Sequence, residues 1–456
     1  MTALWTSAEI EAATGGRANT PFEITGVTFD SREVRSGDLF VAMPGTVHDG
    51  HKFVAGAFAA GAAGAIVSRP VDGPHVLVSD TAAALDALAR ASRARSSAKI
   101  VGVTGSVGKT STKEALYAAL TRFRPGRVHR SVKSYNNHTG VPLSLARMPR
   151  DAEFAVLEMG MNHAGEIAAL TRLVRPHVAI VTAIAPAHIE NLGSEEAIAG
   201  AKAEIFEGLE DGGVAIIPND SPHRDRLVRA ARDRAERIVT FGHGDADVHA
   251  LHAVAEGGGS LITAALLDCD LTFTISQSGE HWVSNALAVL AAVESVGADV
   301  ALAGLALADM TGLKGRGQRF RVRLGSGEIL LIDESYNANP ASMAATLKSL
   351  GAEPGAERRI AVLGPMRELG EHSVAMHAGL APAVLSAKID QLVLIGEEMA
   401  PLADELRGKI EVERAADVEQ ATEALLRRAR PGDAILVKAS NSVGLARLVE
   451  RMAGGA

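Results

Sequence analysis

Residues 99–111, KIVGVTGSVGKTS, have the pattern of a buried strand followed by a phosphate-binding loop. The next residues, TKEALYAALTRF (112–123), have the pattern of a helix, so the loop lies in the strand–loop–helix setting that phosphate binding requires. Glycines let backbone N–H groups surround a phosphate, and the positive end of the helix dipole favours its charge. The residues that we expect to bind a nucleotide here are Thr104, Gly105, Ser106, Val107, Gly108, Lys109, Thr110 and Ser111.

Two side chains of this loop are expected to carry specific chemistry. Lys109 would reach the β- and γ-phosphates, and the Thr110 hydroxyl would hold Mg²⁺. The spacing is shorter than the standard G-x-x-x-x-G-K-[ST], because Val103 rather than a glycine lies five positions before Gly108. We interpret the loop as a shortened variant rather than a glycine-rich turn with an accidental GKT. When the site is empty, we expect the Lys109 ammonium to be solvated.

The strands that follow this loop predict a mostly parallel, doubly wound α/β sheet. Short apolar runs alternate with helical patterns, at FAVLEMG (154–160), VAIVTAI (178–184), GVAIIPND (213–220) and RIVTFGH (237–243). Residues 247–276 change to alternating strands around a GGG turn, which predicts a small antiparallel appendage. A helix is expected to follow at 281–296.

The chain length predicts about three domains, because 456 residues is about three times the roughly 150 residues of an average domain. The N-terminal part alternates helices with strands, at 24–31, 38–43, 63–68 and 75–80. After the glycine-rich stretch TGLKGRGQ (311–318), a smaller Rossmann-like sheet is predicted from strands at 329–335, 359–364, 391–396 and 434–440. The expected fold is therefore three α/β domains, at 1–97, 98–312 and 313–456.

Composition narrows the class of protein. Lys and Arg number 46 against 54 Asp and Glu, a formal charge of −8, which argues against a protein that coats nucleic acid or an anionic membrane. Cys269 is the only cysteine, so a reducing compartment is expected. No apolar run reaches the roughly 18–20 residues of a membrane helix, and the N-terminus lacks the pattern of a secretory signal. We expect a soluble cytoplasmic enzyme or binding protein.

Four more residues are candidates for the site. Glu158 ends the strand at 154–160, and the carboxyl ends of parallel strands face the ligand crevice, so it could bind the nucleotide's metal. His188 follows another strand's carboxyl end, where a functional role competes with a structural one. Lys202 has the pattern of a solvated helix face, and sequence physics alone does not select it. Arg316 lies in the glycine-rich joint, where it could meet a transferring phosphate or form an interdomain ion pair.

Several motifs, in order along the chain, resemble the Mur ligase family, the ATP-dependent amide ligases of peptidoglycan synthesis. They are TGSVGKTS (104–111), LEMGMNHAGEI (157–167), APAHIENLGSEEAIAGAKAEIF (185–206), SNALAVLAA (284–292), LKGRGQR (313–319) and IDESYNANPASM (332–343). The segments most similar to the members that add D-alanyl-D-alanine are NNHTGVPLSL (136–145), YNANP (336–340) and MRELGEHS (366–373).

The resemblance implies an N-terminal UDP-substrate domain, a central ATPase domain and a C-terminal Rossmann-like domain. It implies an enzyme that joins UDP-N-acetylmuramoyl-tripeptide to D-alanyl-D-alanine through an acyl phosphate, with ATP and Mg²⁺ as cofactors. Such a ligase serves cell-wall biogenesis, cell shape and cell division, and is expected to be a cytoplasmic monomer. The third residue of the tripeptide is either diaminopimelate or lysine.

The resemblance also assigns roles to single residues. Lys109, His188, Lys202 and Arg316 match catalytic positions. Thr110 and Glu158 match the ligands of a first Mg²⁺, and His188 and Lys202 match positions serving a second, with Lys202 open to carbamylation by CO₂. The ATP-site positions outside the loop are Asn285 for adenine, Arg316 for phosphate, Asp333 or Glu334 for ribose, and Asn337. The UDP-substrate positions are Ser31, Arg32, Asn136, Asn137 and Thr139.

Three departures from the family pattern matter. Val107 replaces a polar loop residue, Glu334 stands where a second Asp usually contacts the ribose, and VKASNSVGL (437–445) lacks the Arg of the usual K-G-S-R-S. Two alternatives stay open. Another ligase of this fold, adding a single amino acid or glutamate to folate, would share the central motifs. A non-catalytic P-loop switch would hydrolyse ATP without any amino acceptor.

Overall fold

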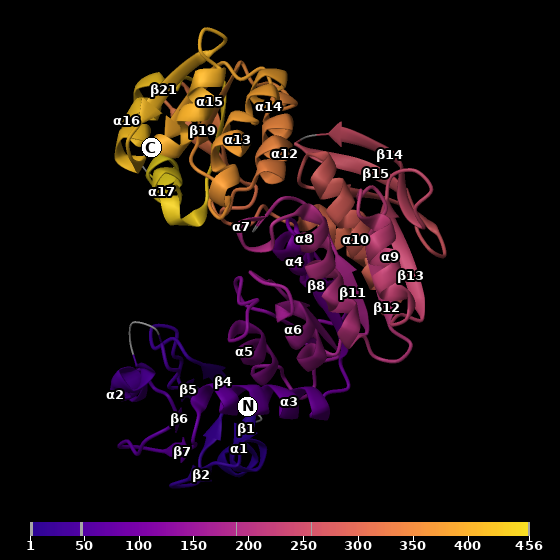
Figure 1. Ribbon diagram of the computed structural model, residues 1–456, viewed down its shortest axis with the longest axis vertical. Coiled ribbons are helices and arrows are strands. Elements are labelled where there is room, and N and C mark those ends of the chain that lie inside the picture. The colour runs from indigo at the N-terminus through magenta and orange to yellow at the C-terminus, as the bar shows by residue number, and fades with distance from the viewer. Residues whose placement is uncertain (1–2, 46–48, 188, 257, 455–456) are drawn as a thin grey trace.

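The N-terminal unit of the computed structural model is a small five-stranded α/β sheet (Figure 1). The structure describes residues 3–45, 49–187, 189–256 and 258–454. The sheet order is β2 (Arg17–Ala18), β7 (His75–Leu77), β6 (Gly64–Val67), β5 (Asp38–Val41) and β4 (Gly26–Thr28). The other elements are β1 (Trp5–Thr6), α1 (Ser7–Thr14), β3 (Glu23–Ile24), η1 (Gly50–Phe53), α2 (Val54–Ala59) and α3 (Thr81–Arg95).

The central unit is built on a nine-stranded sheet. Its order is β16 (Asp270–Ile275), β15 (Gly259–Ala265), β14 (Val248–Glu256), β13 (Arg237–Gly242), β12 (Val214–Pro218), β11 (Val178–Val181), β8 (Lys99–Thr104), β10 (Phe154–Glu158) and β9 (Val128–Arg130). All neighbours from β9 to β14 are parallel, and the pairs β14–β15 and β15–β16 are antiparallel. The predicted antiparallel appendage is confirmed, and it extends the central sheet, because β14 also pairs with β13.

Helices cover both faces of the central sheet. They are α4 (Lys109–Phe123), α5 (Gly140–Ala146), α6 (Glu166–Val174), α7 (Ile189–Leu192), α8 (Glu195–Ala203), η2 (Glu204–Gly208), α9 (Arg224–Arg232), α10 (Glu280–Ser295) and α11 (Val300–Asp309). The middle of α10, Ala286–Val293, is fully enclosed, which fits its unbroken apolar sequence. The helix predicted at 281–296 is therefore confirmed within one residue at each end.

The C-terminal unit has a six-stranded sheet. Its order is β17 (Gln318–Leu324), β18 (Gly327–Glu334), β22 (Asp433–Lys438), β19 (Arg358–Leu363), β20 (Gln391–Ile395) and β21 (Glu411–Ala415), with only β17 antiparallel among these described strands. Its helices are α12 (Pro340–Gly351), η3 (Gly370–His372), α13 (Ser373–Ala378), α14 (Ala381–Ser386), η4 (Glu397–Met399), α15 (Ala400–Glu405), α16 (Val418–Arg428), η5 (Asn441–Val443) and α17 (Ala446–Gly454).

Five strands escaped the sequence analysis, namely β1, β2, β9, β17 and β21. Each of them lies at an edge of its sheet. Edge strands carry charged side chains and need no continuous apolar run, as QRFRVRL (318–324) and EVERA (411–415) illustrate. The patterns of buried strands therefore predicted the interior strands of the three large sheets, but only some of the border strands, such as β4 and β16.

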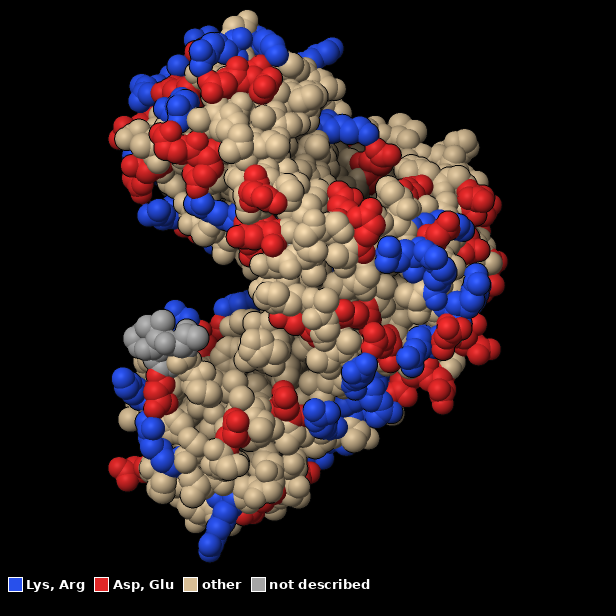
Figure 2. Space-filling view, in the orientation of Figure 1, with Lys and Arg blue, Asp and Glu red and all other residues tan. Residues whose placement is uncertain are grey.

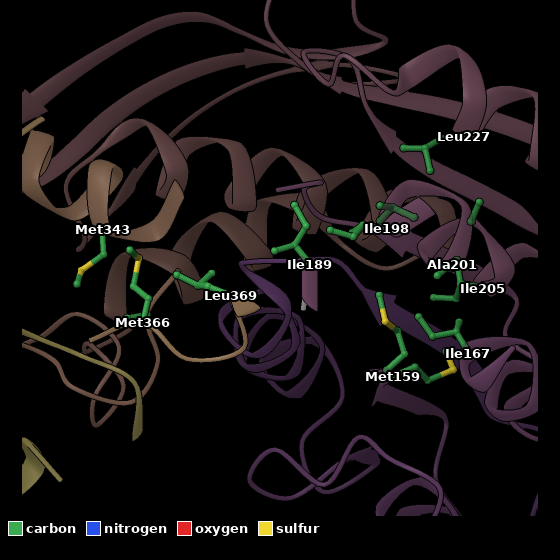
Figure 3. Close-up of a cluster of buried hydrophobic side chains, with 14 of the residues drawn as sticks. Met159, Ile167, Ile189, Ile198, Ala201, Ile205, Leu227, Met343, Met366 and Leu369 are labelled. Atoms are coloured by element: carbon green, nitrogen blue, oxygen red, sulfur yellow. The ribbon is translucent and has the colours of Figure 1, made fainter. Parts of the chain in front are cut away.

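A buried apolar cluster joins the central and C-terminal units (Figure 3). Ile189 of α7 and Leu369, just before η3, belong to this one cluster, and the two elements are in contact. Gly370 lies close against Glu190, since a Cβ placed there would come 3.0 Å from the Glu190 Cγ. This contact holds the two units together beside the cavity described below.

The space-filling view shows a hollow between the N-terminal and C-terminal units (Figure 2). Lys and Arg side chains lie on the N-terminal rim of that hollow. Among the described residues, we find no helix with the length and apolar character needed to cross a membrane. The strand ends of the central sheet carry the candidate site.

Candidate active site

The loop between β8 and α4 adopts the conformation expected of a phosphate-binding loop. Gly108 has a φ of 86°, and a Cβ there would come 2.7 Å from the Asn285 Oδ1. Gly105 has a φ of 147°, and a Cβ there would come 2.0 Å from the Thr182 Oγ1. The Thr182 hydroxyl in turn donates to the carbonyls of Thr104 (3.2 Å) and Val107 (2.5 Å), and these contacts hold the loop against the end of β11. Both glycines are thus required by conformation and by space.

A cavity of about 620 Å³ opens in front of this loop. It is formed by the loop, the ends of β10 and β11, the start of α10 and segments of the C-terminal unit. The predicted residues that line it are Ser106, Val107, Gly108, Lys109, Thr110, Ser111, Asn136, Asn137, Glu158, Asn285, Arg316, Glu334 and Asn337. The predicted residues that do not line it are Ser31, Arg32, Thr104, Gly105, Thr139, Lys202 and Asp333.

The Lys109 ammonium lines the cavity but is only partly exposed, so it is less solvated than expected from sequence. It donates to the Gly105 carbonyl at 2.6 Å, because the loop curls back over its own lysine. Burial lowers the pKa of Lys109, with Glu158 opposing this effect and Arg316 adding to it. The ammonium therefore occupies the hollow of the loop where a phosphate would be received.

Glu158 is a buried carboxylate held by several neighbours. Its Oε2 accepts from the Thr110 hydroxyl at 3.0 Å, and its Oε1 accepts from the Asn136 amide at 2.8 Å. Hydroxyl and carboxylate oxygens are the hard ligands that Mg²⁺ takes, usually together with substrate phosphates and water. Thr110 and Glu158 therefore fit a Mg²⁺ beside the loop. Among the described residues, no group of three or more His, Cys, Asp or Glu forms a complete metal site.

Lys202 lies in the interior, so the expectation of a solvated helix face is wrong. It is fully buried in α8, and its Nζ has no hydrogen-bond partner among the described residues. Burial lowers the pKa of Lys202 far below its usual value, and Lys109 adds to this, while Glu204 and Glu166 oppose it. An orphaned amine beside the loop lysine fits a group that is modified or liganded. His188, the other residue predicted for this position, lies outside the described residues.

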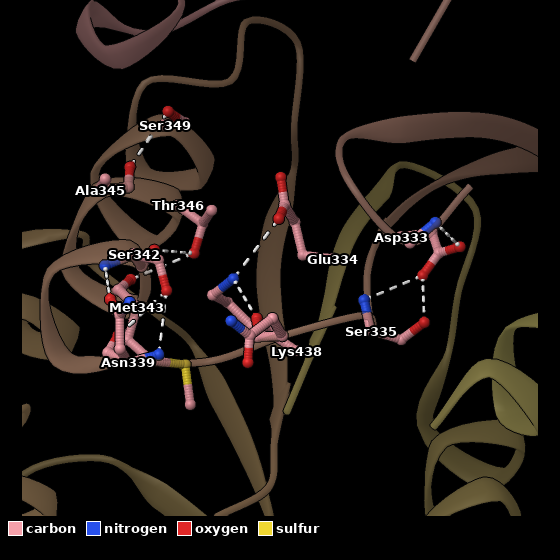
Figure 4. Close-up of polar contacts among 12 residues, drawn as sticks. Asp333, Glu334, Ser335, Asn339, Ser342, Met343, Ala345, Thr346, Ser349 and Lys438 are labelled. Carbon is pink, nitrogen blue, oxygen red and sulfur yellow. Dashed lines mark hydrogen bonds and ion pairs between the residues drawn. The ribbon is translucent and has the colours of Figure 1, made fainter. Parts of the chain in front are cut away.

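The C-terminal unit closes the cavity with Arg316, Tyr336 and Glu334. The Arg316 guanidinium lies over the Tyr336 ring, with Cζ 4.3 Å from the ring centre. Glu334 faces Lys438, whose ammonium lies 3.4 Å from the Glu334 Oε2 and donates to the Asn337 carbonyl at 3.0 Å (Figure 4). These side chains form the wall opposite the phosphate-binding loop.

Asp333 and Glu334 have different surroundings. Asp333 is buried, and its carboxylate accepts from the Gly315 N–H (2.8 Å), the Ser335 N–H (3.0 Å) and the Ser335 hydroxyl (2.6 Å). Its Oδ2 therefore holds the glycine-rich joint at Gly315, and its Oδ1 holds Ser335. Glu334 lines the cavity, and burial raises the pKa of its carboxyl, with Lys438 opposing the shift. Of the two, Glu334 is the residue available to a ligand.

The predicted UDP-substrate residues form two groups. Asn136 and Asn137 line the cavity, and the Thr139 hydroxyl donates to the Asn137 Oδ1 at 3.0 Å. Ser31 and Arg32 lie apart, on the N-terminal unit. Arg32 is exposed and pairs with Asp30 at 2.7 Å, which lowers the pKa of Asp30 to about 2.

Sequence reasoning missed several residues of the site, namely Lys113, Glu166, His281, Trp282, Tyr336 and Lys438. Lys113 lies one helical turn after Lys109, and that spacing places both on one face of α4. Lys438 directly follows the apolar run 434–437 of its strand, which is an unusual place for a lysine. Burial lowers the pKa of His281 to about 4, with Lys438 as a further cause, so this ring is neutral at pH 7. The helical spacing of Lys113 and the strand-end position of Lys438 are both visible in the sequence.

Three family models match consecutive parts of the chain. They are described as the Mur ligase family, catalytic domain (residues 23–96), the Mur ligase middle domain (103–293) and the Mur ligase, glutamate ligase domain (318–441). Together they cover the N-terminal, central and C-terminal sheets.

Individual relatives match over nearly the whole length. The UDP-N-acetylmuramoyl-tripeptide--D-alanyl-D-alanine ligase of Synechocystis sp. is 35% identical over 439 residues, which is 94% of this chain and 92% of the relative. A crystal structure of MurF from Acinetobacter baumannii superposes with a TM-score of 0.86 at 30% identity, covering 99% of both chains. MurF ligase from Thermotoga maritima in complex with ADP superposes with a TM-score of 0.79 at 30% identity, covering 94% of this chain and 97% of that one.

Proposed function

The chain belongs to the Mur ligase family, and we propose that it joins D-alanyl-D-alanine to UDP-N-acetylmuramoyl-tripeptide with cleavage of ATP to ADP and phosphate. The observation that carries this proposal is the match, at 30–35% identity and over nearly the whole length, to relatives and structures named for that activity. The cavity supports it, because a phosphate-binding loop on one unit faces cationic and polar side chains on another.

The chemistry begins with a carboxylate, which is a poor acyl donor. An oxygen of the tripeptide carboxylate attacks the γ-phosphorus of ATP, the bond to the β-phosphate oxygen breaks, and ADP leaves. The resulting acyl phosphate is attacked at carbon by the dipeptide amine, which loses a proton. The tetrahedral intermediate then expels inorganic phosphate and leaves an amide. Because anions must approach one another, cationic screening and positioning should dominate catalysis.

The residues around the cavity suit these steps. Lys109 would leave the Gly105 carbonyl and pair with the transferring phosphate. Arg316 would leave the Tyr336 ring and neutralise the same group from the C-terminal unit. Asn285, next to Gly108, would contact the adenine. Glu334 would contact the ribose, in place of the alternative Asp333, since Glu334 lines the cavity while Asp333 is buried and hydrogen-bonded to Gly315 and Ser335.

Thr110 and Glu158 would hold Mg²⁺ at the loop, where their oxygens already lie 3.0 Å apart. When bound, the ion would screen the phosphate charges and stabilise charge that develops in the transition state. We assign a second cation to Lys202 and His188 on the family resemblance and on the buried Lys202 amine, which has no hydrogen-bond partner in the part of the chain that the structure describes.

An unmodified ammonium would repel a cation, so we propose that Lys202 is carbamylated. The neutral amine attacks CO₂, an N–C bond forms, and a proton is released to solvent. The product is an anion with two oxygens, which suits Mg²⁺. The reaction needs the neutral amine, and the burial that lowers the pKa of Lys202 favours that form.

The remaining expectations follow from the same family. We propose that the enzyme acts as a monomer in the cytoplasm, with domain limits at 1–97, 98–312 and 313–456. We further propose that Ser31 and Arg32 meet the uridine nucleotide, while Asn136, Asn137 and Thr139 meet the muramyl-peptide.

The test is phosphate release from ATP with UDP-N-acetylmuramoyl-tripeptide present and the amino acceptor varied. We expect release with D-alanyl-D-alanine, little with D-alanine or other single amino acids, and none without an acceptor. Release with a single amino acid only would favour another ligase of this family. Release that does not depend on any acceptor would favour a P-loop hydrolase and contradict the proposal.

A further inference from the structure

Lys113 is a buried lysine for which the proposed chemistry has no task. It lies on α4, one turn after Lys109, and its side chain has no exposed surface. Its ammonium donates to the Lys133 carbonyl at 2.6 Å, and it lies 3.1 Å from the Glu114 Oε1 and 3.7 Å from the Glu158 Oε2. Burying an ammonium is costly unless it is paired and hydrogen-bonded, so these three contacts account for its place.

The segment that Lys113 contacts also holds Glu158. The Ser131 hydroxyl accepts from the Glu158 N–H at 3.0 Å, and the Asn136 amide donates to the Glu158 Oε1 at 2.8 Å. Between them, Lys133 has a φ of 54°, a left-handed conformation that is uncommon for a non-glycine residue. The Lys113 ammonium therefore fixes the strained centre of segment 131–136, which holds the backbone N–H of Glu158 at one end and its carboxylate at the other.

The same segment reaches the N-terminal unit. The Lys133 ammonium forms an ion pair with Glu33, and the Tyr135 hydroxyl donates to the Glu33 Oε1 at 3.3 Å. The Tyr135 ring also lies 5.6 Å from the Phe29 ring. Glu33 directly follows Arg32, one of the residues proposed for the uridine nucleotide. One short segment thus contacts both a proposed substrate loop and a proposed metal ligand.

We propose that Lys113 is a positioning residue that fixes segment 131–136 against Glu158 and, through the Lys133–Glu33 pair, links the N-terminal segment 30–33 to the metal-facing carboxylate. The linkage half of this inference rests on the proposed function, because it needs the UDP-substrate to bind at 30–33. The positioning half needs only that Glu158 holds Mg²⁺ beside a bound nucleotide.

Charge alone and positioning predict opposite effects of removing the ammonium. Lys113 is a cation 3.7 Å from Glu158, so a purely electrostatic role would oppose Mg²⁺, and its loss would tighten Mg²⁺ binding. If the lysine instead positions Glu158, its loss frees the Lys133 carbonyl, loosens the segment and weakens Mg²⁺ binding. A role in folding alone would change the thermal midpoint and leave the Mg²⁺ affinity unchanged.

The first experiment titrates Mg²⁺ into the full-length enzyme with ADP bound, followed by calorimetry. Lys113→Met should weaken Mg²⁺ binding by about tenfold or more, equivalent to about 1.4 kcal/mol. Lys133→Ala is the matched control, since it removes an exposed side chain and keeps the backbone carbonyl that Lys113 contacts. It should leave Mg²⁺ affinity within about twofold. Tighter or unchanged binding in Lys113→Met would overturn the positioning role.

The second experiment measures how much Mg²⁺–ADP changes the affinity for UDP-N-acetylmuramoyl-tripeptide. Because linkage is reciprocal, both Lys133→Ala and Glu33→Gln should bring this coupling factor close to one, while the wild type keeps a factor of about five or more. An unchanged coupling factor in both variants would overturn the link. If the wild type does not bind the UDP-substrate at all, the proposed function fails instead. This experiment does not use Lys113→Met, so it decides the linkage half of the inference even if that variant does not fold.

Discussion

Two buried lysine–glutamate pairs face each other across the cavity, one on each unit. On the central unit, Lys113 lies 3.7 Å from Glu158, which also accepts hydrogen bonds from Thr110 and Asn136. On the C-terminal unit, Lys438 lies 3.4 Å from Glu334, and among the described residues it is the only hydrogen-bond partner of that carboxylate. Both glutamates end a strand that has a parallel neighbour, yet one is held from several sides and the other from one.

The different hydrogen bonding of Glu158 and Glu334 indicates that the two units contribute differently to the cavity. On the central unit, which forms one wall of the cavity, hydrogen bonds already hold the phosphate-binding loop and the Glu158 carboxylate in place. On the opposite wall, Arg316 lies over Tyr336 and Glu334 lies against Lys438, so in the roles proposed above both side chains would change partners when a nucleotide binds. The predictions below test the central wall first and the C-terminal wall afterwards, in order of decreasing effect.

The largest effect is expected from Lys109→Ala. Removing a cation from the transferring phosphate should lower turnover by roughly a thousandfold or more, about 4 kcal/mol. The thermal midpoint should move by no more than about 4 °C, because one hydrogen bond to the Gly105 carbonyl is lost. Lys409→Ala, at an exposed lysine of the C-terminal unit, is the control and should keep full activity. Substantial residual ligation by Lys109→Ala would contradict the loop assignment.

The next effect is expected from Lys202→Ala, which should be nearly inactive, with a loss of roughly a hundredfold or more. Formate or acetate should restore part of the activity, because a small carboxylate can occupy the place of the carbamate. The wild type with the same acids is the control and should not be stimulated. Absence of rescue, together with crystallographic density for an unmodified amine in active enzyme, would remove the carbamate proposal.

Arg316→Ala tests whether Arg316, on the C-terminal wall of the cavity, contributes only after it has left the Tyr336 ring. We expect kcat to fall by roughly a hundredfold while the affinity of the free enzyme for UDP-substrate stays within about twofold. Arg321→Ala, at an exposed arginine of β17, is the control and should change neither. Equal losses in kcat and UDP-substrate affinity would indicate a structural role for Arg316 instead.

The smallest effect concerns stability. Glu334→Gln leaves the buried Lys438 ammonium with neutral acceptors only among its described partners, so the unfolding free energy should fall by about 2 kcal/mol. Combining it with Lys438→Met removes both charges and should restore most of that loss. Thermal unfolding of the two single variants and the double variant measures the coupling. Purely additive losses would show that the pair is not coupled.

The sequence predicted the parts of the molecule that depend on local pattern. The loop at 104–111, the interior strands of each sheet and the three-domain architecture followed from glycine spacing and apolar runs. The family resemblance added Glu334 and Asp333 as alternative ribose contacts. Only the structure shows that both carboxylate oxygens of Asp333 accept hydrogen bonds, from Gly315 and Ser335. Partners that lie far apart in sequence determine which carboxylate is free.

Lys202 shows where local pattern misleads. A lysine on a helix is usually solvated, yet α8 carries alanine, glycine and isoleucine around most of its surface, and such a helix is buried. Lys113 was overlooked for a similar reason, because its partners Lys133 and Glu158 come from two other elements. Burial of a charged side chain is set by tertiary packing, which the spacing of residues in one helix does not specify.

The central claim, that the carboxylate is activated as an acyl phosphate, is tested most directly by oxygen transfer. UDP-N-acetylmuramoyl-tripeptide labelled with ¹⁸O in its terminal carboxylate is incubated with ATP, Mg²⁺ and D-alanyl-D-alanine, and the products are analysed by mass spectrometry. We predict one labelled oxygen in each inorganic phosphate and the other in the carbonyl of the new amide. Amide formation with unlabelled phosphate, or labelled ADP, would contradict this account.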